Sequence, residues 1–319
     1  MATTAPPHTA QPTYGLRGGA LSPLETLAQS VSTIAPTTTP AATIPLVCAL
    51  AGNGTWLAYL LATLAVLLVA LCVAEFARYS ASPGSLYIYT SKVMPPFVGA
   101  TSAWSLLLAY IATASSVTGG FYHYGNLLLH DATGHGTSAV FLALICAAVA
   151  IWIAWRDVEI SARLMLWIEA LSVTLILTLV VLVLVRTGFH PDLQQFRLRG
   201  MTGSGLRLGL VLSLFSFVGF ESATTLGSEA RNPLRTIPRA VIQSALLAGA
   251  IFTLCAYTEV LGFRAAGQDL GSNQAPLRVL AALKTVAGHV EPAETRWMDV
   301  DRRQGVAVVG DGICYLDYN

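Results

Sequence analysis

Long apolar runs separated by short polar segments dominate the chain between residues 27 and 263. The runs are about 18 residues or longer, the length that an α-helix needs to cross a hydrocarbon core of roughly 30 Å. Because lipid offers no partners for backbone N–H and C=O groups, each run is expected to be helical. The pattern predicts seven membrane spans, at 27–49, 54–76, 97–129, 138–155, 164–185, 208–227 and 241–263.

Composition agrees with burial in lipid. Of the 319 residues, 54% are apolar and only 11% are charged, whereas soluble domains carry roughly 25% charged residues. So few charged side chains could not cover a surface exposed to water. A net charge of +1 without a basic patch excludes nucleic acid as a partner. The lipid bilayer is the environment that this composition predicts.

Motifs typical of enzymes and metal sites are missing from the sequence. We find no nucleophile elbow, phosphate-binding glycine loop or zinc motif, so neither an enzyme nor a bound cofactor is expected. His130, Asp131 and His135 lack a fixed helical spacing and are interpreted as part of a solvated loop rather than as metal ligands.

Basic residues between the spans indicate the orientation. With a cytoplasmic N-terminus, the inner segments hold Arg17, Arg78, Lys92, Arg156, Arg163, Arg231, Arg235 and Arg239, and the outer segments hold Arg186, Arg197, Arg199, Arg207 and Arg264. By the positive-inside rule, the excess on the inner side favours a multi-pass protein of the cell membrane with its N-terminus in the cytoplasm.

Both ends of the chain differ from its apolar middle. Residues 1–23 have no apolar core and are expected to be a disordered cytoplasmic N-terminus. The membrane domain is expected at 24–283, with a short amphipathic helix at 268–282. Residues 284–319 contain no run that could span a membrane and crowd charged residues together. We interpret them as a polar tail foreign to the fold, as a frameshift would produce.

The first predicted span is interrupted. Its stretch 30–40, SVSTIAPTTTP, contains Pro36 and Pro40, which remove helix hydrogen bonds, and hydroxyl residues where leucines would be usual. The backbone there is expected to be unwound. The alternative is a kinked helix whose Ser and Thr hydroxyls bond back to helix carbonyls.

The sixth predicted span is interrupted as well. Gly219 and Glu221 break the apolar run 212–227, LSLFSFVGFESATTLG, close to mid-membrane. A carboxylate at that depth costs about 2.5 kcal/mol or more, so Glu221 is expected to face protein or water. It could contact a substrate or a proton, or it could bond unwound backbone N–H groups and hold the break open.

Broken helices at corresponding places in two halves of a chain indicate a mid-membrane site in transporters built from inverted repeats. Half-helix N-termini present free N–H groups to an anionic group such as an α-carboxylate. Exposed carbonyls at the other broken ends can accept hydrogen bonds from an ammonium group. The first and sixth spans together would therefore suit a zwitterion.

The same residues resemble a known family. Residues 215–223, FSFVGFESA, and 229–240, EARNPLRTIPRA, are closely similar to the sixth-span signature of amino acid permeases in the amino acid, polyamine and organocation (APC) superfamily. Residues 34–36, 82–89 and 104–110 support the resemblance, which covers roughly 24–282.

This resemblance implies a five-plus-five inverted-repeat transporter fold that holds an amino acid or polyamine between the first and sixth spans. Carried over by position, Ile34, Ala35, Pro36 and Thr37 would meet the carboxylate end of the substrate, and Phe215, Ser216 and Gly219 would line the sixth-span side. Glu221 joins these substrate-binding candidates because of its depth in the sixth span. Phe215 stands where the family often has an aromatic gate, although it could equally face lipid. Tyr110 is a further candidate.

The sequence also departs from the family. Ten spans make up the repeat pair and twelve are usual, so the chain reads as a fold truncated after about seven spans. Transport in the family uses an ion gradient, here H⁺ or Na⁺, or exchange. The lysine that some proton-coupled relatives carry in the fifth span is missing between Arg163 and Arg186. Glu169, the acid present there, could be a coupling group or an anchor at the inner end.

Two functions therefore stay open. The chain is a secondary permease that works by alternating access, or it is an inactive truncated remnant or a non-transporting membrane partner. A seven-helix receptor fits the number of spans, but it conflicts with the predicted orientation and with the broken spans.

Overall fold

The computed structural model describes residues 19–80, 82–155, 158–227, 229–273, 275–282, 306–309 and 312–315. Its longer helices are α3 (Thr55–Tyr79), α5 (Pro96–Thr133), α6 (Ala139–Ala154), α7 (Val158–Arg186) and α10 (Pro233–Ala265). The shorter helices are α1 (Pro23–Ile34), α2 (Ile44–Ala51), α4 (Ser85–Val93), α8 (Leu193–Phe196), α9 (Gly203–Phe215) and α11 (Pro276–Ala282). A π-helix η1 (Thr39–Thr43), two 3₁₀ segments, η2 (Gly52–Gly54) and η3 (Ser222–Leu226), and a hairpin of β1 (Val306–Val309) and β2 (Gly312–Tyr315) complete the described part.

All seven predicted spans contain helix, so the prediction of an all-α chain is confirmed. By length and composition, four helical stretches are long and apolar enough to cross a membrane, at Pro23–Tyr79, Pro96–Thr133, Leu164–Arg186 and Pro233–Ala265. Two shorter apolar helices, Ala139–Ala154 and Gly203–Phe215, occupy the fourth and sixth predicted spans. The first predicted span is divided into α1, η1 and α2.

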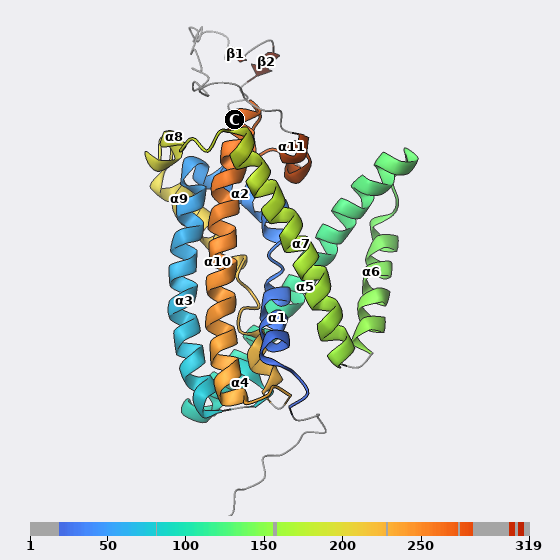
Figure 1. Cartoon of the computed structure of the whole chain (residues 1–319), viewed down its shortest axis with the longest axis vertical. Helices are drawn as coiled ribbons and strands as arrows, with labels where there is room; N and C mark the ends of the chain where they lie inside the picture. Colours follow the sequence, from blue (N-terminus) through green and yellow to red (C-terminus); the bar gives the residue numbers. More distant parts are fainter. Residues whose placement is uncertain are drawn as a thin grey trace, which may run out of the picture.

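The core of the bundle is the seam between α3 and α10, which run side by side in Figure 1. Small residues let the two backbones approach closely. A Cβ atom added to Gly249 of α10 would lie 2.2 Å from Cγ2 of Thr63 on α3. Aromatic rings fill the space beside the seam, where Phe252 packs against Tyr59 and Phe217 with ring centroids 5.9 and 5.1 Å apart. In lipid the hydrophobic effect does not drive helices together, because lipid tails are as apolar as leucine, so close packing at small residues contributes to their association.

The broken first helix and α9 cover this seam. Helix α2 packs along α9, and a Cβ atom added to Gly205 of α9 would lie 2.2 Å from the carbonyl oxygen of Leu50. Helix α1 lies against α10 and α7. These contacts bring the first and sixth predicted spans into one layer, with their interruptions close together.

Helices α5 and α6 diverge from this body (Figure 1). They pack on each other, yet of the 38 residues of α5 only Gly99 is buried. Helix α5 also packs against α4, where Ser102 Oγ lies 3.5 Å from Thr90 Oγ1. Further side-chain contacts reach other segments of the described residues. Tyr110 and Tyr124 bond to Glu221 and to the carbonyl oxygen of Ala41, and Asp131 pairs with Arg278.

A cluster of polar side chains closes the end of the bundle that carries α8. Arg264 of α10 donates hydrogen bonds to Asp192 and to Asn53. Asp192 also accepts a bond from Gln195 Nε2 at 3.0 Å, and its backbone N–H donates to the Tyr257 hydroxyl at 2.9 Å. This cluster links α10, α8 and the turn that precedes α3.

The ends of the chain are only partly described. Residues 1–18 of the expected disordered N-terminus lie outside the described residues, but Leu21 is buried and exchanges backbone hydrogen bonds with Glu229 and Arg231. Helix α1 then begins at Pro23, four residues before the predicted span, because Ser22 and Glu25 form a capping box. Most of the predicted foreign tail 284–319 lies outside the described residues, apart from the hairpin.

The amphipathic helix expected at 268–282 is shorter than predicted. The structure has turns first and then α11, Pro276–Ala282. The Asp269 carboxylate accepts hydrogen bonds from the N–H groups of Gly271 and Ser272, at 3.2 and 3.1 Å, which favours a turn over a helix.

Candidate functional site

The first helix breaks directly after Ile34. Ala35 adopts a left-handed conformation with φ 50°, and its N–H bonds to the carbonyls of Val31 and Ser32. Pro36 cannot donate a hydrogen bond, so the α-helical ladder stops there. Helical structure resumes in the π-helix η1, which contains Pro40. The unwound backbone expected around Pro36 is what the structure shows.

The sixth predicted span breaks after Phe215. Residues 216–221 form turns, and η3 follows as a 3₁₀ segment. Gly219 has φ 101°, a conformation that glycine adopts without strain. A Cβ atom at Gly219 would also lie 2.5 Å from Cγ2 of Thr33, so the two breaks meet at this residue.

Hydroxyl side chains join the two breaks. Ser30 of α1 donates to the carbonyl oxygen of Phe220 at 3.0 Å and accepts from the N–H of Ala223 at 2.9 Å. Ser222 donates to Thr33 Oγ1 at 3.0 Å. Thr33 bonds back to the carbonyl of its own helix, as the alternative interpretation of the first span expected, but Ser30 and Ser222 connect the two segments instead.

Backbone polar groups remain open at this junction. Within the described residues, the N–H groups of Thr37, Gly219 and Glu221 donate no hydrogen bond, and the carbonyls of Thr33 and Ile34 accept none. Free N–H groups can hold a carboxylate, and free carbonyls can accept hydrogen bonds from an ammonium group. The junction therefore has the donors and acceptors that a zwitterion requires.

Glu221 lies at the same junction and is 6% exposed. Its Oε1 atom accepts a hydrogen bond from the Tyr110 hydroxyl at 3.0 Å, which brings α5 to the break. Among the described residues, the carboxylate makes no bond to a backbone N–H. Its role, in substrate or proton contact or in holding the break open, stays a prediction. On the other side, the Tyr59 hydroxyl lies 3.3 Å from Ser216 Oγ.

Comparison with known proteins agrees with this architecture. The family model described as amino acid permease matches residues 21–290, which is most of the chain. The chain belongs to the amino acid permease family. Membership of this family, together with several long apolar helices, makes it a polytopic membrane protein and a transporter-family chain rather than an enzyme.

Curated relatives in this permease family match about two thirds of the chain. The branched-chain amino acid permease BcaP of Lactococcus lactis is 26% identical over 219 residues, which cover 63% of this chain and 47% of BcaP. Cationic amino acid transporter 4 of Mus musculus is 27% identical over 220 residues, 64% of this chain and 35% of that protein. The low-affinity putrescine importer PlaP of Escherichia coli is 29% identical over 210 residues, which cover 63% of this chain and 44% of PlaP. The chain thus spans less than half the length of these relatives.

The structure of this permease-family chain gives the other predicted site residues different surroundings. Ile34 and Pro36 are buried behind the break, and Thr37 is partly exposed. Phe215 is 42% exposed, whereas the neighbouring Phe217 is buried against Phe252. An aromatic gate at Phe215 therefore stays a prediction.

Glu169 lies apart from these contacts on α7. Its side chain is partly buried, and its Oε1 atom has no hydrogen-bond partner among the described residues. No hydrogen bond links it to the residues of the two breaks. Its role as a coupling group or as an anchor stays a prediction.

Glu259 of α10 was missed by the sequence analysis. It is 2% exposed, and neither carboxylate oxygen has a partner among the described residues. The signal was present, because an acid within an apolar span is as notable at Glu259 as at Glu221.

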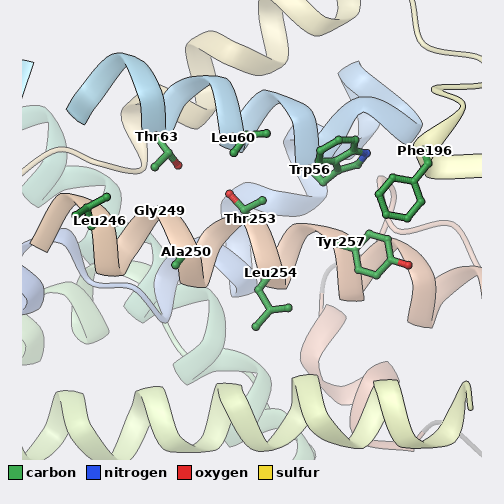
Figure 2. Close-up of a pocket in the computed structure, with 10 residues that line it drawn as sticks. All are labelled: Trp56, Leu60, Thr63, Phe196, Leu246, Gly249, Ala250, Thr253, Leu254 and Tyr257. Atoms are coloured by element: carbon green, nitrogen blue, oxygen red, sulfur yellow. The ribbon is translucent and has the colours of Figure 1, made fainter. Parts of the chain in front are cut away.

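A groove of about 480 Å³ lies elsewhere, between α3 and α10 (Figure 2). Trp56, Phe196 and Tyr257 stand at one end of it, and Leu246 at the other. Leu246 and Leu254 of this groove are also 47% and 39% exposed, so the groove opens to the surroundings of the bundle. None of the predicted substrate residues lines it. Among the described residues, no group of three or more His, Cys, Asp or Glu is placed to hold a metal ion.

Proposed function

We propose that this chain takes part in secondary active transport of amino acids or related amines by alternating access. The substrate site is the junction between the break after Ile34 and the break after Phe215. The contact of Gly219 with Thr33, beside open backbone donors and acceptors, is the observation that supports this site most strongly.

In this proposal, the carboxylate of the substrate meets the free N–H groups of Thr37, Gly219 and Glu221. The ammonium group meets the carbonyls of Thr33 and Ile34, with the Glu221 carboxylate nearby. The membrane domain 24–283 has its N-terminus in the cytoplasm and belongs to a five-plus-five inverted-repeat fold. Transport is driven by an ion gradient or by exchange.

Relatives indicate the substrate panel. They are named for branched-chain amino acids, cationic amino acids and putrescine. Labelled leucine, lysine and putrescine should therefore be tested for binding to the 319-residue chain in lipid nanodiscs, and for uptake into proteoliposomes. We expect saturable binding of one of them.

Glu221→Gln is the sharpest variant for this test, because it keeps an oxygen for the Tyr110 hydroxyl and removes the charge. Binding should weaken about tenfold, which corresponds to about 1.4 kcal/mol. Glu75→Gln is the matched control, since Glu75 is 56% exposed and paired with Arg78 outside the site. Binding that is insensitive to Glu221→Gln would contradict the proposed site.

A second candidate function is favoured by the exposed faces of α5 and α6. Their small contact with the body suits a membrane partner that binds but does not transport. Binding without uptake would favour this second candidate, and uptake by the 319-residue chain would exclude it.

A further inference from the structure

Glu259 is a buried acid that the proposed substrate site does not use. It lies near the end of α10, 2% exposed, and both carboxylate oxygens lack hydrogen-bond partners among the described residues. Most buried polar groups in proteins are hydrogen-bonded, so two open oxygens on one carboxyl group need an explanation.

The surroundings of Glu259 are apolar and nearly closed. The hollow beside it has a volume of only about 10 Å³ and is bounded by Pro40 of η1, Val180 and Val183 of α7, and Leu277 and Leu280 of α11. Thr258 also borders the hollow, but its hydroxyl donates to the carbonyls of Leu254 and Cys255. A hollow of this volume is at the lower limit for one water molecule, and its mainly apolar lining would offer that water few partners.

The titratable groups that lie close enough to Glu259 to interact with its charge carry no positive charge. They are Cys48 of α2, Tyr59 of α3, Tyr124 of α5 and Cys255 of α10 itself. The lining residues of η1, α7 and α11 have no titratable side chains. All four facing groups are neutral near pH 7.

The cations of the neighbouring segments are engaged elsewhere. Arg264 bonds to Asp192 and Asn53, and Arg278 pairs with Asp131. Arg186 donates to the carbonyl oxygen of Ala281 at 3.4 Å. An ionised Glu259 would therefore be a buried charge without compensation, which costs far more than binding a proton.

We propose that Glu259 is a proton-binding site whose proton is exchanged with water during the transport cycle. In the packed arrangement of α10, α7 and η1 the carboxyl group is protonated. When these elements separate, water enters, the O–H bond breaks, and the proton passes to water while the carboxylate is hydrated. In a later step of the cycle, the carboxylate binds a proton from water, which restores the neutral carboxyl group.

The position of Glu259 connects it with the break in the first helix. Pro40, which borders the hollow, belongs to the π-helix that follows the break, and Tyr124 bonds to the carbonyl of Ala41 in the same π-helix. A substrate that moves η1 therefore changes the packing against Glu259. The coupling of the proton to transport rests on the proposed function, but the protonated state of Glu259 does not.

Infrared spectroscopy tests the protonated state directly. The 319-residue chain in nanodiscs at about pH 8, where solvated carboxyl groups are ionised, should show a carboxylic acid C=O band. The band should disappear in Glu259→Gln and in the apolar variant Glu259→Leu, and persist in Glu169→Gln. No such band, or a band that survives in both Glu259 variants, would overturn the proton site.

Labelling gives an independent readout. Dicyclohexylcarbodiimide reacts with protonated carboxyl groups in apolar surroundings. It should reach and modify Glu259 when α10, α7 and η1 begin to separate, and leave the exposed Glu75 unmodified, as mapped by peptide mass spectrometry. Modification of Glu75 in preference to Glu259 would contradict the proposal.

Uptake separates coupling from the proposed function. A pH gradient should accelerate uptake by the unmodified chain severalfold and have no effect on uptake by Glu259→Gln, while substrate binding stays within about twofold. Equal acceleration of both chains would overturn the coupling alone. Absence of any uptake would overturn the coupling together with transport by this chain, and the infrared result would still decide whether Glu259 binds a proton.

Discussion

Helices α10 and α5 are both long and apolar, yet they differ in how they are held. More than half of the 33 residues of α10 are buried, whereas α5, with 38 residues, buries only Gly99. Both contain many small residues, but in α10 these residues meet α3, and in α5 Gly119 and Gly120 have nothing within 4 Å. Small residues permit close packing, and a facing helix is needed to use them.

The α3–α10 seam should respond most strongly to an added side chain. Gly249→Val would place carbon atoms where Thr63 lies, and we expect it to lower the free energy of unfolding by about 3 kcal/mol. Gly119→Val on α5 meets open space and should change it by less than about 0.5 kcal/mol. Denaturation in detergent micelles, followed by tryptophan fluorescence, measures both. Equal losses would mean that α5 is packed as tightly as α10.

The junction of the two breaks should show the next largest effect. In Gly219→Ala, the added methyl group meets both an unfavourable positive φ and a close contact with Thr33. We expect the free energy of unfolding to fall by about 2 kcal/mol. Gly134→Ala, at the end of α5, has φ 73° with nothing within 4 Å and carries the backbone strain alone. The same unfolding measurement should show a smaller loss for Gly134→Ala. A loss at Gly134 as large as at Gly219 would contradict the close approach.

Loss of one hydroxyl group at the junction should cause the third largest loss of stability. Ser30→Ala leaves the N–H of Ala223 buried without an acceptor, which should cost about 1.5 kcal/mol. Ser115→Ala on α5 removes only an exposed bond to its own helix and should be neutral. Thermal unfolding monitored by size-exclusion chromatography would compare them. An unchanged unfolding temperature in Ser30→Ala would show that the junction does not depend on this bond.

The ion pair that connects α5 with α11 should contribute least to the free energy of unfolding. Asp131 and Arg278 are exposed, with side-chain exposures of 47% and 66%, so Asp131→Asn should cost less than about 0.5 kcal/mol. Asp192→Asn affects a carboxylate that is 7% exposed and bonded to Arg264, and it should cost more. Unfolding at low and high salt would separate the two pairs. A larger effect at Asp131 would show that α5 is held more firmly than its contacts indicate.

Much of this fold was predictable from the sequence, because lipid demands long apolar helices and because prolines and glycines interrupt them. Pro36 and Gly219 marked both breaks, and the break positions needed no tertiary information. The partner of Glu221 was not predictable, since the Tyr110 hydroxyl reaches it from a helix that is 111 residues away in sequence. The isolation of Glu259 depends on how η1, α7 and α11 pack around it. No local pattern encodes that arrangement.

The junction also has a consequence for biosynthesis. Ser30 bonds to Phe220, which follows it by 190 residues. At a synthesis rate of about 5–20 residues per second, the first span waits on the order of 10 to 40 s before its partner is made. During this time Thr33 can bond to its own helix, but Ser30 lacks its partner from the sixth span. A ribosome pause before the sixth span would therefore prolong the time during which Ser30 lacks this partner.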